Sequence, residues 1–525
     1  MAPAEAQSRY DCVVIGGGHN GLVCAATLAR GGRSVLLLEA AQQVGGAAVT
    51  REFAPGFRVS AGAHLLHLMP EELLRELKLS AHGLEWAAQG MPTTALKAGG
   101  GALIVNPTEA AQHLSAADSQ ALRAYDARMR RFAAALVPMF TRVPPRLGTT
   151  AWADRLVWLR LGWQIRTLGR RDMRELLRIG GMNVYDLLEE NFESEMLKGA
   201  LGFDAVLGAN FGPRSPGTVL TLLYRLAAEC AAGAGGLSQP KGGMGALCHA
   251  LAGAAAAAGA TIRTGAPVAS IRVEGDRAAG VVLESGERIA AQSVISSADP
   301  KTTFLRLLGP RFLDTGFVRR VNHLRSRGLA AKLHLALKRA PSFSGVSESA
   351  LRGRLLIAPS LQHIEHAYNH AKYGEFSAAP VMEITVPTAN DPALAPAGQH
   401  VLSAIVQYAP YELKEGWQDG RQRFLDRVLD TLEGCAPGLR DSVIGAELLT
   451  PADLAREFRS SGGHWHHADL AFDQFLMVRP VPGASQYRTP LEGLFLCGAG
   501  CHPGGGVMGI AGRLAAQQVL LVHSP

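Results

Sequence analysis

The chain has 525 residues, of which 47% are hydrophobic and 18% charged, a composition typical of a globular protein and not of a disordered one. Its net charge of +7 comes without a lysine-rich block or an aromatic–basic ladder, which argues against nucleic acid as a partner. The seven cysteines lack paired metal-type spacing, and the sequence has neither a signal-peptide pattern nor an apolar stretch long enough to span a bilayer. We therefore expect a cytoplasmic protein, with association to a membrane surface as an open alternative.

The start of the chain reads as a strand, a glycine turn, a helix and a second strand. Apolar residues at Cys12–Ile15 indicate a buried parallel strand, Leu22–Arg30 favours a helix, and Ser34–Leu38 indicates the next strand. The turn Gly16–Gly21 has the pattern GxGxxG, in which the glycines permit a tight turn, a pyrophosphate against the backbone and close packing of helix on strand. The unit therefore predicts a dinucleotide site, with phosphate at the start of the helix.

Glu39 ends the second strand, eighteen residues after Gly21. A carboxylate at this position accepts hydrogen bonds from both hydroxyls of an adenosine ribose and repels the 2′-phosphate of NADP. A second glycine pair, Gly45 and Gly46, follows closely, as a chain needs when it passes along an extended dinucleotide that carries a ribityl and a flavin. These residues favour FAD over NAD.

With Gly16–Glu39 and Gly45–Gly46 the chain resembles the flavoprotein superfamily of amine oxidases and phytoene desaturases. Within it, the chain is most similar to the branch of the O-type carotene ketolases and the pyridine nucleotide-disulfide oxidoreductase domain-containing protein 2 group. The resemblance implies an α/β fold in which a Rossmann-like FAD-binding lobe, a doubly wound parallel sheet with an inserted β-meander, is interleaved with an α+β substrate lobe.

The resemblance also implies roles for single residues. The backbone at Val268 is expected to lie against the adenine, with an ordinary sheet valine as the alternative. Many members carry arginine after the glycine pair, where this chain has Ala47 and Ala48, so that phosphate contact is absent or comes from elsewhere.

The middle of the chain, from about Pro70 to Gly236, has mainly helical periodicity. Within it Trp152–Arg178 is rich in arginine, and four of its large apolar residues share one helical stripe, namely Trp152, Leu156, Leu159 and Trp163. Such a face suits a membrane interface. The alternatives are a helix that covers the substrate lobe, or an oligomer contact, with solvated arginines.

The segments after Gly236 return to the nucleotide lobe. Lys241–Gly245 indicates a glycine turn, the alanine-rich run to Ala258 a helix, and the stretch from Thr261 to Ile289 a strand meander. A further strand is expected at Leu329–Leu337 within a strand-rich region. We therefore assign residues 1–70, 237–313 and 481–525 to the FAD-binding lobe, and residues 71–236, its helical part, with 314–480 to the substrate lobe.

The end of the chain has the same predicted order of strand, glycine-rich loop and helix as its start. Between an apolar strand, Leu494–Cys497, and a helix, Ile510–Leu521, lies a loop, and the stretch Gly498–Gly512 has glycine at seven of its fifteen positions. We expect the loop to make room for the flavin ring and ribityl, and the helix start to stabilise negative charge near N1 of the reduced flavin. The loop offers no acid for the ribityl hydroxyls, so backbone or other side chains must bind them.

Several histidines are candidates for a role at the site. Four ligands within His464–Asp469 would need a sharply curled backbone, so we predict no metal; we expect these histidines to face substrate or flavin, or to be bonded in the core. His64 and His502 are the catalytic candidates, because they lie in the segments expected next to the flavin ring. Neither is required as a general base, because hydride transfer depends mainly on alignment.

The sequence thus predicts an FAD-dependent oxidoreductase that moves a hydride from an apolar, polyene- or carotenoid-like small molecule to flavin N5. The alternatives are a flavoprotein oxidase or dehydrogenase of a small amine or alcohol, and a flavin-binding regulatory protein with little turnover. The residues expected to bind the cofactor are Gly16, Gly17, Gly18, His19, Asn20, Gly21, Glu39, Ala40, Gly45, Gly46, Ala47, Val268, Gly498, Gly505, Gly506 and Val507.

Overall fold

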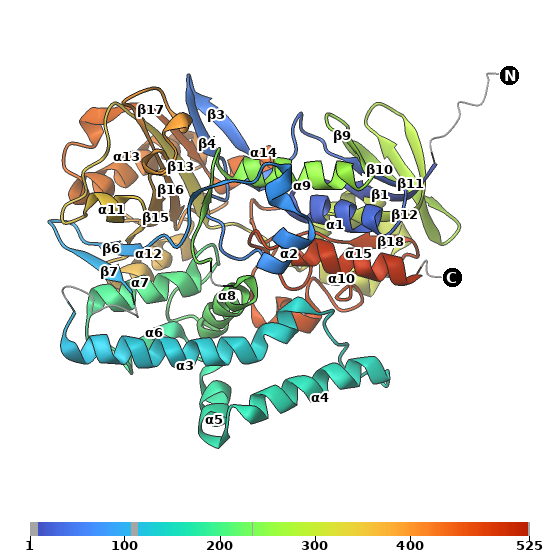
Figure 1. Cartoon of the computed structure of the whole chain (residues 1–525), viewed down its shortest axis with the longest axis horizontal. Helices are drawn as coiled ribbons and strands as arrows, with labels where there is room; N and C mark the ends of the chain where they lie inside the picture. Colours follow the sequence, from blue (N-terminus) through green and yellow to red (C-terminus); the bar gives the residue numbers. More distant parts are fainter. Residues whose placement is uncertain (1–8, 107–113, 234, 523–525) are drawn as a thin grey trace.

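The computed structural model describes residues 9–106, 114–233 and 235–522. Two seven-stranded sheets lie side by side and carry helices on their outer faces (Figure 1). Both parallel and antiparallel strand pairs occur, so the predicted α/β class is confirmed. Every strand of the first sheet comes from residues 1–70, 237–313 or 481–525, and every strand of the second from 71–236 or 314–480. The lobe boundaries themselves remain a prediction.

The first sheet has the order β10-β11-β12-β1-β2-β9, with β18 paired to β12. The strands β12, β1, β2 and β18 are parallel, while β10, β11 and β12 form the predicted antiparallel meander. Parallel strands end at one edge of the sheet, so both glycine motifs begin at that edge. The bounds are β1 (Arg9–Ile15), β2 (Val35–Leu38), β9 (Thr261–Arg263), β10 (Val268–Glu274), β11 (Arg277–Leu283), β12 (Arg288–Ser296) and β18 (Leu494–Leu496).

Helices α1, α9 and α15 pack on this sheet, and α1 and α15 lie side by side (Figure 1). Their close approach depends on Gly512, where a Cβ atom would lie 2.1 Å from the carbonyl oxygen of Asn20. The first and last helices of the chain are therefore locked together. The bounds are α1 (His19–Arg30), α9 (Met244–Ala257) and α15 (Ile510–Val522), which confirms all three predicted helices to within a few residues.

The second sheet has the order β17-β13-β16-β15-β14-β6-β7. One face packs on α13 (Trp417–Cys435) through buried leucines, valines and phenylalanines. Because side chains alternate along a strand, the residues between those apolar ones point to the opposite face. The bounds are β6 (Thr93–Leu96), β7 (Ala102–Val105), β13 (Ala330–Leu337), β14 (Arg354–Ile357), β15 (Val381–Thr385), β16 (His400–Gln407) and β17 (Val443–Leu449).

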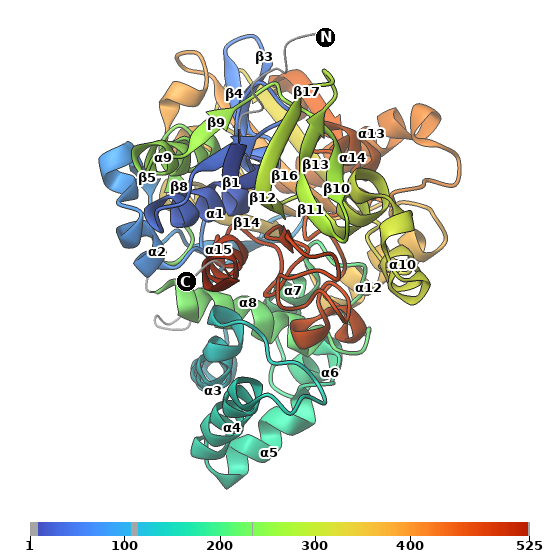
Figure 2. The same cartoon turned by 90° about the vertical axis from the view of Figure 1, so that its right-hand side faces the viewer.

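Helices form the lower part of the molecule in both views (Figures 1 and 2). The helical prediction is confirmed from Ala116 to Ala232 but is wrong for residues 86–105, where three short strands lie. Strands this short carry little periodic signal, and β6 is fixed by pairing with the distant β14. The helices are α3 (Ala116–Thr141), α4 (Trp152–Thr167), α5 (Arg170–Ile179), α6 (Val184–Glu189), α7 (Glu195–Val206) and α8 (Thr218–Ala232).

The remaining elements are short and connect the two sheets or flank them. Within the described ranges, no helix combines the length and the apolar character needed to cross a bilayer. The short elements are α2 (Glu71–Glu76), β3 (Thr50–Ala54), β4 (Phe57–Ser60), β5 (Trp86–Ala88), β8 (Gln239–Pro240), α10 (Thr315–Asn322), α11 (Glu348–Leu351), α12 (Leu361–Lys372) and α14 (Pro451–Glu457).

Candidate active site

A cavity of about 650 Å³ is lined by residues of both sheets. Its size is typical of small-molecule sites, which span roughly 300–1,000 Å³. Residues from the start and from the end of the chain meet on its wall. Of the residues expected to bind the cofactor, those on the wall are Gly16, Gly18, His19, Asn20, Glu39, Ala40, Gly45, Gly46, Ala47, Val268, Gly506 and Val507.

The first glycine turn holds helix α1 against the sheet. A Cβ atom at Gly21 would lie 2.0 Å from the carbonyl oxygen of Gly16, so only glycine permits this packing. The carboxylate of Glu39 accepts hydrogen bonds from the amides of Gly17, at 2.6 Å, and Ala41, at 2.8 Å. A Cβ atom at Gly18 would meet nothing within 4 Å, so open space lies in front of the start of the helix. That space is where the sequence predicts the pyrophosphate.

The glycines of the last loop divide into two groups. Gly498 and Gly505 press against the protein itself, since added Cβ atoms would lie 2.3 Å from the carbonyl oxygen of Ser297 and from Nδ1 of His466. Neither residue is on the cavity wall, whereas Gly506 and Val507 are. Most of this glycine content therefore lets the chain pack closely, and the part facing the cavity is small. Contact of Gly498 and Gly505 with the cofactor remains a prediction.

Buried polar atoms without partners surround the cavity. Within the described residues, Asn20 Oδ1 and one ring nitrogen each of His19, His466 and His467 have no hydrogen-bond partner, and all four residues line the cavity. Leaving such an atom unpaired costs about 1–3 kcal/mol. Together with the helix start and the open space at Gly18, these atoms fit a ligand rich in polar groups, as FAD is.

Burial lowers the pKa of four histidines, His19, His64, His467 and His502, to about 4. They are therefore neutral at pH 7, whereas histidines of the unfolded chain titrate near 6.5. Above pH 6.5 the four imidazole rings are neutral in both the folded and the unfolded chain. Between about pH 6.5 and pH 4 they bind protons only in the unfolded chain. Unfolding is therefore favoured as the pH falls. Each histidine contributes up to about 1.4 kcal/mol per pH unit.

We therefore expect the free energy of unfolding to fall steeply from pH 6.5 to pH 5, as measured by denaturant titration at several pH values. His502→Gln should reduce this slope, while His370→Gln, which replaces an exposed histidine, should leave it unchanged. A stability that stays constant between pH 7 and 5 would contradict the neutral, buried state of these rings.

A buried network of charged and polar side chains lies in the cavity wall next to the second sheet. The Nζ of Lys332 donates to Nδ1 of His64 at 2.7 Å, and Nε2 of His64 lies 2.8 Å from Oε1 of Glu383. Because the ionised carboxylate of Glu383 only accepts, Nε2 of His64 carries the proton that it donates to Oε1, and Nδ1 is left to accept from Lys332. Arg354 donates Nε to Glu383 and Nη2 to Asp204, the latter at 2.5 Å. Each group thus has a partner of complementary character.

The pKa values in this buried network follow from burial and charge pairing. Burial lowers the pKa of Lys332 to about 7, against the opposing charge of Glu383. Burial would raise the pKa of Glu383, but Arg354 and His64 hold it well below its usual value. Lys332 is therefore poised to gain or lose a proton near neutral pH, while Glu383 stays ionised.

The sequence interpretation found His64 but missed Lys332, Arg354 and Glu383. Each is a single charged residue in a short apolar strand segment, such as LAAKLHLAL around Lys332. A charge in such a run is a usable signal, because charged side chains are almost never fully buried unless they are paired. Which residues they pair with depends on the tertiary fold.

The other catalytic candidate lies elsewhere. His502 is fully buried, its ring centroid is 6.5 Å from that of Phe140, and it does not line the cavity. His464 is bonded to Asp469 at 2.8 Å, while His466 and His467 line the cavity as expected for a role near substrate or flavin. In the part of the chain that the structure describes, no three histidine, cysteine or acidic residues are grouped to hold a metal ion.

Comparisons with known proteins agree with this geometry. Residues 21–520 match the family described as flavin containing amine oxidoreductase. The pyridine nucleotide-disulfide oxidoreductase domain-containing protein 2 of Mus musculus is 36% identical, covering 99% of this chain and 94% of that protein. The phytoene dehydrogenase of Streptomyces griseus is 28% identical, covering 97% of this chain and 94% of that protein.

The crystal structure of an oxidoreductase from Methanosarcina mazei has the same fold, with a TM-score of 0.60 at 20% identity, covering 97% of this chain and 99% of that one. The resemblance inferred from the glycine motifs is thus confirmed, and so is FAD as the cofactor. The chain belongs to the flavin containing amine oxidoreductase family and is an FAD-dependent oxidoreductase.

Proposed function

We propose that the protein dehydrogenates a predominantly apolar substrate of the polyene or carotenoid class. The observation that carries this proposal is the apolar part of the cavity wall. It comes from several distant segments, namely Leu65, Leu68, Ala205, Leu207, Ala209, Ile405, Trp465 and Leu470. A wall of this kind binds hydrocarbon by removing it from water. The likeness to a phytoene dehydrogenase supports the same substrate class.

Bound FAD supplies a hydride acceptor at its N5 atom. The protein would contribute binding and alignment: Glu39, on the cavity wall, would bind the ribose, and the apolar wall would hold the substrate and exclude water. Glu383 holds His64 in the form with its proton on Nε2, and Nζ of Lys332, next to Nδ1, can take up or release a proton near neutral pH. His64 lines the cavity and thus connects this lysine to the site.

Lys332→Met tests that connection. We expect the rate of FAD reduction in the wild type to change with an apparent pKa near 7, because the charge state of Lys332 changes there. The variant should lose this transition, as followed by anaerobic stopped-flow absorbance at pH 6 to 9. Lys338→Met, which replaces an exposed lysine next to the same strand, should keep it. A transition that persists in Lys332→Met would assign it to another group.

A second candidate function, oxidation of a small amine or alcohol, is favoured by His67. Both its ring nitrogens are buried without hydrogen-bond partners among the described residues, and the residue lines the cavity. Burial and the charge of Arg225 hold its pKa well below the usual value. A neutral imidazole of this kind suits a substrate hydroxyl or amino group.

The two candidates are separated by anaerobic reduction of the bound FAD, followed as loss of visible absorbance. Our proposal predicts bleaching with polyenes delivered in detergent micelles and none with small amines or alcohols. Bleaching only by amines or alcohols, and its loss in His67→Phe, would establish the second candidate. No bleaching with either class would favour a flavin-binding regulatory protein.

A further inference from the structure

Helix α4 presents a row of large apolar side chains to solvent. Trp152, Leu156, Leu159 and Trp163 are 66%, 37%, 62% and 70% exposed. Spacings of four, three and four residues place them on one side of the helix, which we call the α4 outer stripe. Asp154 is the only residue of α4 that is buried. The stripe therefore faces away from the protein along the whole helix.

The inner side of α4 already has its contacts. Val157 and Leu161 pack against the main core, and Ile165 packs against the second one. The helix thus has apolar residues on two opposite sides, a pattern typical of a helix that is covered on both. An exposed apolar row of this size marks an interaction site.

Most arginines of α4 and of the next helix, α5, are exposed and unpaired. Within the described residues, six exposed arginines of α4 and α5 form no ion pair, namely Arg155, Arg160, Arg166, Arg170, Arg171 and Arg174. The acids of the same two helices are each already paired with an arginine: Asp154 with Arg146, Asp172 with Arg131, and Glu175 with Arg178. The surface formed by α4 and α5 therefore suits a negatively charged partner.

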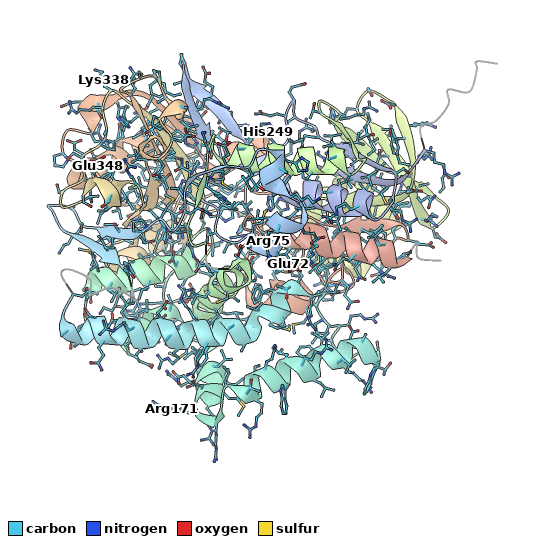
Figure 3. The ribbon with its side chains drawn as sticks, in the orientation of Figure 1. Glu72, Arg75, Arg171, His249, Lys338 and Glu348 are labelled. Atoms are coloured by element: carbon cyan, nitrogen blue, oxygen red, sulfur yellow. The ribbon has the colours of Figure 1, made fainter. Side chains whose placement is uncertain are left out.

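The position of the two helices leaves this face accessible. Figures 1 and 2 show α4 and α5 as the outermost elements at the lower end of the molecule, and Figure 3 shows Arg171 there. At 100° per residue, Arg155 and Arg160 flank the stripe on its two sides. Long arginine side chains in such positions reach headgroup phosphates while the apolar row enters the interface.

We propose that the α4 outer stripe docks the protein on the surface of a membrane that contains anionic lipids. Tryptophans at both ends of the row suit the interfacial region, and the unpaired arginines match the negative charge of the lipid headgroups. A second copy of the chain fits less well, because two identical faces would bring like charges together. This proposal does not depend on the substrate.

The test is co-sedimentation of the FAD-loaded protein with vesicles of phosphatidylcholine alone, or mixed with phosphatidylglycerol. We expect binding to the mixed vesicles that weakens with salt, and little binding to the neutral ones. A variant with Trp152→Ser, Leu159→Ser and Trp163→Ser should lose at least about tenfold in affinity. Tyr373→Ser, at a residue 75% exposed after α12, is the matched control and should bind like the wild type.

Flavin content and the midpoint of thermal unfolding, unchanged in the variants, will show that they are folded. Arg155→Glu with Arg160→Glu keeps the apolar row and should also abolish binding to the mixed vesicles. Vesicle binding that survives both variants, or no binding by the wild type, would overturn the proposal. A wild-type dimer that the triple serine variant converts to a monomer, without vesicle binding, would instead assign the stripe to self-association.

Discussion

Gly18→Ala is expected to weaken FAD binding at least about tenfold while leaving the stability of the apoprotein unchanged. Gly18 has φ −68° and ψ 167°, which alanine adopts freely, and an added Cβ atom would touch nothing within 4 Å. The methyl group would therefore intrude only on a ligand at the start of α1. Titration of apoprotein with FAD measures the affinity, and denaturant unfolding of the apoprotein measures the stability.

Gly21→Ala provides the contrast three residues along the same turn. Its Cβ atom would lie 2.0 Å from the carbonyl oxygen of Gly16, so α1 must move away from the sheet. We expect a loss of about 1–3 kcal/mol in the unfolding free energy in addition to the loss of FAD. Gly162→Ala, in an exposed and open part of α4, is the control and should raise the stability by up to about 1 kcal/mol. Equal FAD affinity in Gly18→Ala and the wild type would mean that the turn does not face the cofactor.

Arg354→Met should lower the unfolding free energy by about 3–5 kcal/mol, the largest effect that we expect on stability. The guanidinium group is fully buried and pairs with the carboxylates of Glu383 and Asp204. Methionine nearly preserves the volume, so the loss arises from two carboxylates left without their common partner in a medium of low polarity. The unfolding free energy from denaturant titration at pH 7 checks this.

Arg352→Met is the matched control for that variant. Arg352 is exposed and lies 3.5 Å from Glu348, a surface pair for which we expect a change within about 0.5 kcal/mol. Adding Glu383→Gln to Arg354→Met should recover part of the loss, because it removes one of the unpaired charges. If Arg354→Met lowers the unfolding free energy as little as the control does, the buried network of charged side chains does not hold the second sheet together.

The cofactor end of the site could be predicted from the sequence because its signals are local. GxGxxG at Gly16–Gly21, Glu39 and the pair Gly45–Gly46 lie within one βαβ unit and its continuation, and all of them reach or support the cavity wall. The C-terminal strand, loop and helix gave the same kind of signal. Residues close in sequence determine these strand–turn–helix units, so periodicity and glycine spacing are enough to predict them.

The buried network of charged side chains could not be predicted in the same way. His64 meets Lys332 across 268 residues of sequence and Glu383 across 319. Strand pairing in the second sheet places Lys332 and Glu383 on either side of β16, and the segment that follows β4 brings His64 against them. The loop at Gly498–Gly509 follows β18 of the first sheet, and most of its glycines serve close packing of the protein on itself, which spacing alone does not reveal.

The central claim is that both ends of the chain bind one FAD molecule in one cavity. The most direct measurement is the flavin content of the purified protein, from its visible spectrum and from the cofactor released on denaturation. We predict one FAD per chain in the wild type, and a Gly18→Ala protein that is fully folded but retains less FAD after purification. A wild-type protein that is colourless, and stays so after incubation with excess FAD, would contradict the account.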